Sequence, residues 1–167
     1  MPRNGFTLIE LMVTISVAAI LLALAAPAFQ GLLISNRITA QTNDLVSDLA
    51  FARSEAIKRG VRVTVCSANT PTTCGAGTGW TQGWIVFVDN GTAGDATGDT
   101  ILRTHEALRG NNTLNSSVNH FISYFPSGTV DALETFTLCN TGFRGRSVDV
   151  SATGRVATTT TLLVCPP

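Results

Sequence analysis

Charged residues and histidines are scarce in this 167-residue chain. Charged side chains make up 13% of it, its 11 Lys and Arg balance its 11 Asp and Glu, and it has 2 histidines. A net charge of zero gives no overall attraction toward nucleic acid or acidic lipid. Neither His105 nor His120 lies in a nucleophile motif, and no paired acids accompany the abundant Ser and Thr. The sequence therefore predicts a protein that is not an enzyme and has no cofactor.

The charge-free stretch that follows Glu10 runs from Leu11 to Ala26. A helix from Phe6 to Phe29 would be about 36 Å long, enough to cross a hydrocarbon core of about 30 Å with some tilt. A secretory signal peptide is disfavoured, because a single cation, Arg3, precedes the run and Glu10 would fall inside its apolar region. A carboxylate at membrane depth costs about 2.5–3.5 kcal/mol on insertion scales, so Glu10 marks a functional site rather than a plain anchor.

The hexapeptide Gly5-Phe6-Thr7-Leu8-Ile9-Glu10, with its apolar helix, resembles the class III leader of type IV prepilins and type II secretion pseudopilins. The resemblance implies that a membrane aspartic peptidase, the prepilin peptidase, cleaves between Gly5 and Phe6 and N-methylates Phe6. Glu10 would be the assembly glutamate, which pairs with the Phe6 amine of a neighbouring subunit inside the apolar bundle. Pro27 stands where prepilins commonly carry a proline, and it predicts a kink or a local unwinding of the helix.

Beyond Pro27 the sequence predicts an amphipathic helix. Apolar residues recur at steps of 7, 4, 3 and 4, which is the spacing of one helix face: Ile38, Leu45, Leu49, Ala52 and Ala56. Arg53, Lys58 and Arg59 crowd the last turns, and Gly60 follows. Because cations complement the helix dipole there and Gly60 suits a left-handed C-cap, we interpret this cluster as helix termination rather than as a binding patch.

After Gly60, short alternating runs separated by Gly, Asn, Thr and Pro are typical of an antiparallel sheet. Seven strands are expected, near 61–67, 83–88, 100–106, 119–125, 135–139, 146–151 and 161–165. The strand ending at Val88 is apolar on both faces, so it must lie between the helix and a further cover. Trp80 and Trp84 are expected to pack in the core or at its rim rather than to bind a ligand.

We therefore predict an α+β fold, in which a long N-terminal helix, hydrophobic and then amphipathic, packs on an antiparallel β-sheet head. The expected segments are a leader peptide (1–5), a transmembrane assembly helix (6–29), an amphipathic helix on the head (30–60) and a β-rich periplasmic or extracellular head (61–167).

Four cysteines permit three pairings that the sequence by itself leaves open: Cys66, Cys74, Cys139 and Cys165. In a periplasmic or extracellular head, disulfides are permitted. We favour Cys66 with Cys74, closing a local loop, and Cys139 with Cys165, which would resemble the disulfide-bounded C-terminal region of many pilins. A zinc site is disfavoured, because the cysteine spacing is not that of a zinc ribbon and neither histidine sits at a ligand interval.

Blocks of the head are similar to the GspH/FimT-like branch of minor pilins and H-type pseudopilins, at residues 51–59, 80–89, 101–103 and 151–155. The resemblance implies a single-pass minor pilin that waits in the bacterial inner membrane with a periplasmic head and then enters a type IV pilus, priming assembly or sitting near the tip. Its partners would be other major and minor pilins or pseudopilins, the prepilin peptidase and the inner-membrane assembly platform. An H-type minor pseudopilin of type II secretion shares every feature and stays an alternative.

Three arginines raise a second alternative, a DNA-binding minor pilin for natural transformation. Arg144, Arg146 and Arg155 lie in a segment, residues 140–167, whose sole acid is Asp149. Arginine beside Gly and Thr contacts phosphates without reading bases. Some members of the resembled branch are DNA-uptake pilins, so double-stranded DNA is an alternative partner, whereas an ion pair of Arg155 with Asp149 is the plainer reading.

A turn-rich stretch holds three carboxylates, Asp89, Asp95 and Asp99, which are weak candidates for calcium ligands. Their spacing does not match an EF-hand, in which ligands alternate and a Glu closes the loop. We therefore expect a solvated hairpin loop there and no metal.

Overall fold

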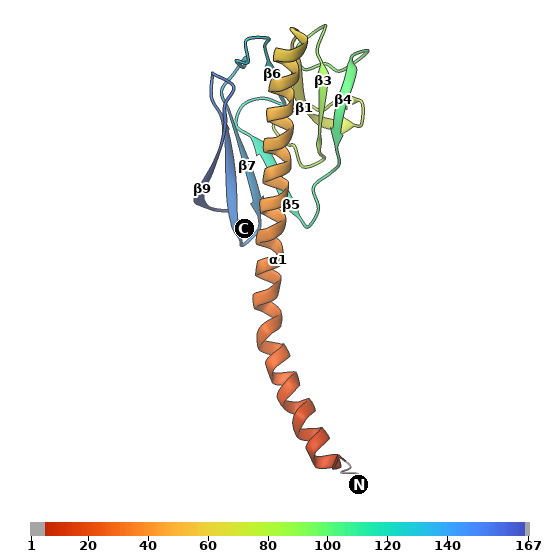
Figure 1. Ribbon diagram of the computed structural model, residues 1–167, viewed down its shortest axis with the longest axis vertical. Coiled ribbons are helices and arrows are strands. Elements are labelled where there is room, and N and C mark those ends of the chain that lie inside the picture. The colour runs from red at the N-terminus through yellow and green to blue at the C-terminus, as the bar shows by residue number, and fades with distance from the viewer. Residues whose placement is uncertain (1–5, 166–167) are drawn as a thin grey trace.

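The computed structural model describes residues 6–165, apart from the side chains of residues 26–28, 144 and 160–164. A 52-residue helix, α1 (Leu8–Arg59), stands against a β-rich head with its upper half and projects from the head with its lower half (Figure 1). The predicted α+β fold, with one long N-terminal helix packed on antiparallel strands, is confirmed.

Both ends of α1 carry the caps that their residues favour. Thr7 is the N-cap, and its hydroxyl accepts a hydrogen bond from the Glu10 backbone N–H at 3.3 Å. Gly60 ends the helix in the left-handed region (φ 67°), with its N–H donating to the Ala56 carbonyl at 3.0 Å. The predicted glycine C-cap is confirmed.

The strands of the described chain form two antiparallel sheets. In the first, the order is β2 (Thr73–Cys74), β1 (Val63–Thr70), β3 (Trp84–Val88) and β4 (Thr100–His105), with β6 (Phe121–Tyr124) also pairing with β1. In the second, the order is β5 (Asn112–Ser116), β7 (Glu134–Asn140), β8 (Arg144–Val150) and β9 (Val156–Val164). Each of the seven predicted strands overlaps one of these, whereas β2 and β5 were not predicted and β9 begins earlier than expected.

The main core lies between the upper half of α1 and the two sheets. All five residues of the predicted helix face, from Ile38 to Ala56, are at most 2% exposed. They pack with side chains from both sheets, including Val65, Ile122, Phe136 and Val148. The same helix face therefore shares one core with both sheets.

Strand β3 is buried on both faces, as its sequence predicted. Trp84 and Val86 face the helix and belong to the main core. Ile85 and Phe87 face away and form a second cluster, which is covered by Ala96 of the β3–β4 loop and by Phe121. The β3–β4 loop is therefore the further cover that this strand needs.

Candidate functional site

The lower half of α1 presents an apolar surface that is largely uncovered by the described residues. It is long and apolar enough to span a membrane, and none of its most apolar stretch is buried against the head. Side chains along it, such as Leu8, Leu24 and Phe29, are 61–76% exposed. An unpartnered apolar stripe of this length needs lipid or other helices around it.

Glu10 lies near the start of this surface and is exposed. The Thr7 hydroxyl, 3.5 Å from Oε2, is its one side-chain hydrogen-bond partner among the described side chains, and no cation among them pairs with it. Phe6 is 78% exposed, and Gly5 lies outside the described residues. Among the described side chains, the Glu10 carboxylate therefore has no cationic partner.

Pro27 lies within α1, which the backbone follows as one helix from Leu8 to Arg59. The lower part of the ribbon is inclined to the part that packs on the head (Figure 1). The side chain of Pro27 lies outside the description, so its assignment as the cause of a kink stays a prediction.

The upper half of α1 docks on the first sheet through a buried polar contact. Asp48 is 8% exposed, accepts a hydrogen bond from the Trp84 indole N–H at 2.9 Å and pairs with an Arg103 guanidinium nitrogen at 2.8 Å. The Arg103 guanidinium also lies 3.8 Å from the centroid of the Phe51 ring, a cation–π contact. One carboxylate thus ties β3 and β4 to the helix.

Both histidines pack against aromatic rings. His105 stacks on Trp84 with ring centroids 3.8 Å apart, and its Nε2 lies 3.7 Å from an Asp44 carboxylate oxygen. His120 lies edge-on to Phe121. Among the described residues, no group of three or more His, Cys, Asp or Glu side chains gathers at one point.

Arg53 ties the helix to the β6–β7 and β8–β9 loops, and this role was missed in the sequence. Its Nε donates to the Gly128 carbonyl and its Nη2 to the Thr153 carbonyl, each at 3.0 Å. The interpretation of Arg53 as part of helix termination is therefore wrong. Lys58 and Arg59 instead pair with Glu55, and the hydrogen bond from Arg59 holds the pKa of the Glu55 carboxyl below its usual value.

The Arg53 contact explains why a glycine stands at position 154, in the sequence block of residues 151–155. Gly154 has φ +71°, and a Cβ there would overlap the Gly128 carbonyl and lie 3.2 Å from Arg53 Nε. Since two backbone turns and a guanidinium meet at this point, glycine is the residue that fits. The contact joins a helix arginine to a Thr-Gly turn 100 residues away. Spacing along the chain does not reveal a contact of this kind.

The disulfides join Cys66 to Cys74 and Cys139 to Cys165, the pairing that the sequence analysis favoured. The first links β1 to the short strand β2, which sequence reasoning missed. The second links the end of β7 to the chain beyond β9, so that it fastens the last described residues to the second sheet.

The aspartates of the β3–β4 loop do not converge on one point. Asp89 accepts hydrogen bonds from Arg62, Thr64 and the Gly94 N–H, and its side chain is fully buried. Hydrogen bonding by the Thr97 side chain and by the Thr97 N–H holds the pKa of the Asp95 carboxyl below its usual value, and Asp99 accepts hydrogen bonds from Asn90. Each carboxylate thus stabilises its own turn.

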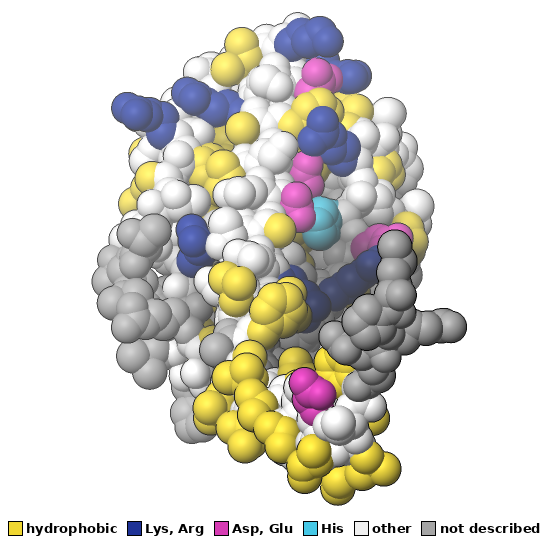
Figure 2. Space-filling model, turned by 60° about the horizontal axis from the view of Figure 1, so that its bottom comes forward, with side chains coloured by type: hydrophobic (Ala, Val, Ile, Leu, Met, Phe, Trp, Pro, Cys, Tyr) yellow, Lys and Arg dark blue, Asp and Glu magenta, His cyan; other side chains and the backbone are white. Residues whose placement is uncertain are grey.

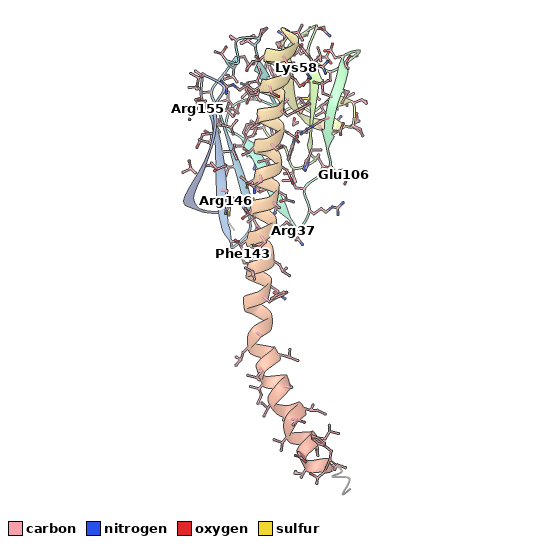
Figure 3. The ribbon with its side chains drawn as sticks, viewed as in Figure 1. Arg37, Lys58, Glu106, Phe143, Arg146 and Arg155 are labelled. Atoms are coloured by element: carbon pink, nitrogen blue, oxygen red, sulfur yellow. A yellow bond between two sulfur atoms is a disulfide. The ribbon has the colours of Figure 1, made fainter. Side chains whose placement is uncertain are left out.

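The candidate DNA-binding arginines do not form one surface. Arg146 lies near the start of β8, and Arg155 follows its end, opposite Ser151. At about 3.4 Å per residue, the five residues from 146 to 151 separate the two by about 17 Å along the sheet. Figure 3 shows Arg146 toward the end of the head where the helix emerges and Arg155 toward the other. The side chain of Arg144 lies outside the description.

Comparisons with known proteins point to one group. The family model for the type II transport protein GspH matches residues 41–154, more than half of the chain, and the model for the prokaryotic N-terminal methylation motif matches residues 1–26. No sequence among curated proteins matches the chain.

Solved structures of similar fold have 12–21% identical residues, so they are evidence for the fold alone. One is the type IV minor pilin FimU of Pseudomonas aeruginosa in space group P21, with a TM-score of 0.60 and 21% identity over 75% of this chain and 90% of that one. A second crystal form of FimU from Pseudomonas aeruginosa, in space group P65, has a TM-score of 0.57 and 20% identity, over 72% of this chain and 91% of that one. The minor pseudopilin EpsH from the Type 2 Secretion System of Vibrio cholerae has a TM-score of 0.52 and 12% identity, over 74% of this chain and 96% of that one.

Proposed function

We propose that this chain, which belongs to the GspH family, is a minor subunit of a type IV pilus that primes assembly or sits near the filament tip. The family comprises minor pilins and pseudopilins, structural subunits of filaments, and the methylation motif agrees with that role.

The observation that carries the proposal is the division of α1 into two halves. One face of the upper half is buried against the head, whereas the lower half has an apolar surface and a carboxylate that pairs with no cation among the described side chains. In the membrane, lipid would cover this surface; in a filament, the helices of other subunits would do so. Because a buried carboxylate is costly unless it is paired, the contact that satisfies Glu10 also fixes the axial register of the subunit.

Processing would supply the missing cation. Cleavage between Gly5 and Phe6 by the prepilin peptidase places a new amine at Phe6, and N-methylation preserves its positive charge. That amine on one subunit would pair with Glu10 of the next. Other major or minor pilins and the inner-membrane assembly platform are the partners that this route requires.

The test is incorporation of Glu10→Gln and Gly5→Leu chains into filaments, in cells that lack the wild-type chain. Glu10→Gln should be processed, as judged by its mass, but absent from sheared filaments. Gly5→Leu should remain unprocessed in the membrane. Thr14→Val is the matched control, because it removes a polar group one turn from Glu10 without removing a charge. Normal incorporation of Glu10→Gln, or full processing of Gly5→Leu, would refute the proposal.

Two narrower alternatives differ in the partner rather than in the fold. An H-type pseudopilin of type II secretion would be required for secretion of exoproteins and dispensable for pili, so deletion of the gene distinguishes it. A DNA-uptake pilin would shift duplex DNA in a salt-dependent way that is lost on changing Arg144 and Arg146 together to Ala. The separation of Arg146 from Arg155 makes this second alternative the weaker one.

A further inference from the structure

The end of the head from which α1 emerges carries a set of cations that the filament role does not use. We define this arginine base by the side chains of Arg37, Arg109 and Arg146. Arg37 comes from the helix, Arg109 from the β4–β5 loop and Arg146 from β8. Figure 2 turns this end toward the viewer and shows Lys and Arg side chains on the head beside the apolar helix.

We propose that the arginine base binds the phosphate groups of anionic phospholipids while the subunit waits in the membrane. The inference rests on the proposed function, because it requires the lower half of α1 to be inserted in a bilayer.

The position of Arg37 along α1 sets the depth of the arginine base in a bilayer. No charged residue occurs from Leu11 to Asn36, and Leu32 and Leu33 are the last exposed large apolar residues before Arg37, at 55% and 48% exposed. Arg37 lies four residues beyond Leu33, which is about 6 Å along the axis. The headgroup layer on each side of a bilayer is about 5–7 Å thick. With Leu33 at the hydrocarbon boundary, Arg37 lies among the headgroups.

The head itself reaches this depth. A Cβ at Gly31 would lie 3.8 Å from the Phe143 ring, so the β7–β8 turn extends along the helix to a level below Leu33. Phe143 is 38% exposed. In Figure 3 it lies with Arg37 and Arg146 where the helix leaves the head. The head therefore does not stand clear of the membrane surface when the apolar half of α1 is inserted.

Buried amides hold the base in shape. Gln41 donates to the Arg109 carbonyl at 3.1 Å, and Asn140 donates to the Gly110 carbonyl at 2.8 Å. Gly110 has φ +82°, and a Cβ there would overlap the Arg37 guanidinium. The β4–β5 loop is thus fixed against the helix with Arg37 lying across it. A hollow of about 380 Å³ opens beside this loop, with Arg37, Gln41 and Arg109 in its lining.

The charges favour an anionic partner even though the whole chain is neutral. Glu106 lies 3.3 Å from Arg109 and offsets its charge, and Asp44 stands two turns above Arg37 in the same hollow. Neither Arg37 nor Arg146 pairs with a carboxylate in the described part of the chain. These two arginines, on different elements, therefore carry the attraction, and each cation near an anionic surface strengthens binding about five-fold.

Hydrogen exchange of the full-length chain in lipid nanodiscs tests the proposal. With phosphatidylglycerol present, amides of residues 106–111 and 141–143 should be protected relative to phosphatidylcholine alone, whereas residues 91–98 should not change. Arg37→Gln with Arg146→Gln should weaken the docked state about 25-fold. Arg155→Gln, at the other end of the head, should have no effect. In the wild type, 0.5 M salt should release the protection, which checks the charge effect without any substitution.

The other outcomes are each decisive. Equal protection in both lipids, or none in either while helix residues 11–33 are protected, would overturn the lipid contact and leave the filament role intact. If the amides of residues 11–33 exchange as fast as those of an uninserted helix, both the lipid contact and the proposed filament role would be overturned. Protection of the base by duplex DNA but not by phosphatidylglycerol would overturn the lipid contact in favour of nucleic acid.

Discussion

Asp48 is the residue whose loss should most weaken the docking of α1. It is a helix carboxylate that holds Trp84 of β3 and Arg103 of β4 at the same time. Asp48→Ala removes both contacts without adding volume to the core. Asp48→Asn keeps an oxygen that accepts the indole hydrogen bond and removes the charge.

The structure sets the size of the effect. Trp84 is fully buried, so Asp48→Ala leaves its indole N–H without an acceptor, which costs about 1–3 kcal/mol. The Arg103 side chain is 45% exposed, so loss of the ion pair adds about 1 kcal/mol at most. The sum is about 1–4 kcal/mol, which is a large part of the free energy of unfolding of a small domain, about 5–15 kcal/mol. For Asp48→Asn the loss should be about 1 kcal/mol.

Urea unfolding of the full-length oxidised chain in a mild nonionic detergent, followed by tryptophan fluorescence, measures this loss. Asp44→Ala is the matched control, because that carboxylate lies one turn away, is 54% exposed and stands 3.7 Å from His105. It should cost less than about 0.5 kcal/mol. Equal losses for Asp48→Ala and Asp44→Ala would refute the role given to the buried contact.

Three further predictions concern the head, and the same unfolding assay measures each. Tyr124 is fully buried, its hydroxyl has no hydrogen-bond partner among the described residues, and burial raises the pKa of its phenol. The folded state therefore keeps this proton more tightly, so its stabilising effect is full below pH 10 and is lost as pH rises further. Tyr124→Phe should gain about 1 kcal/mol and reduce the alkaline loss, and an unchanged alkaline limb would contradict this. Gly154→Ala should lower the free energy of unfolding by about 2 kcal/mol more than Gly142→Ala, because both positions have positive φ but only Gly142 is surrounded by open space. Equal losses for the two variants would show that the Gly128 carbonyl moves aside without cost. Changing Cys139 and Cys165 together to Ser removes a cross-link that spans 26 residues and should cost about 3.5 kcal/mol, and a loss below about 1 kcal/mol would contradict the entropic estimate.

The helix and the central strands could be predicted because their local signals agree with the fold. The buried face from Ile38 to Ala56 follows a helical period, and Gly60 is a residue that a left-handed cap requires. The stretch from Trp84 to Val88 is apolar on both faces and is buried on both. In each case the local residue pattern and the tertiary surroundings favour the same secondary structure and the same buried face.

Strand β5 could not be predicted, because its sequence, Asn-Thr-Leu-Asn-Ser, is that of a turn. It forms a strand since tertiary partners satisfy its polar groups: Asn112 binds Gln41 and Asn140, and Ser116 accepts from the Trp80 indole. The division into two sheets depends on such contacts as well. The roles of Asp48 and Arg53 were missed for the same reason, because their partners lie 36 to 100 residues away.

The depth proposed for the arginine base also bears on Glu10. Residues 10 and 37 are separated by 27 positions, about 40 Å along a straight helix. The hydrocarbon core is about 30 Å thick and the whole bilayer about 40–45 Å. With Arg37 among the headgroups on one side, Glu10 would reach the opposite interface, where its carboxylate would be hydrated. Under the proposed function, the cost of burying Glu10 would arise when the subunit is drawn into the filament, at the step where the Phe6 amine of a neighbour would offset it.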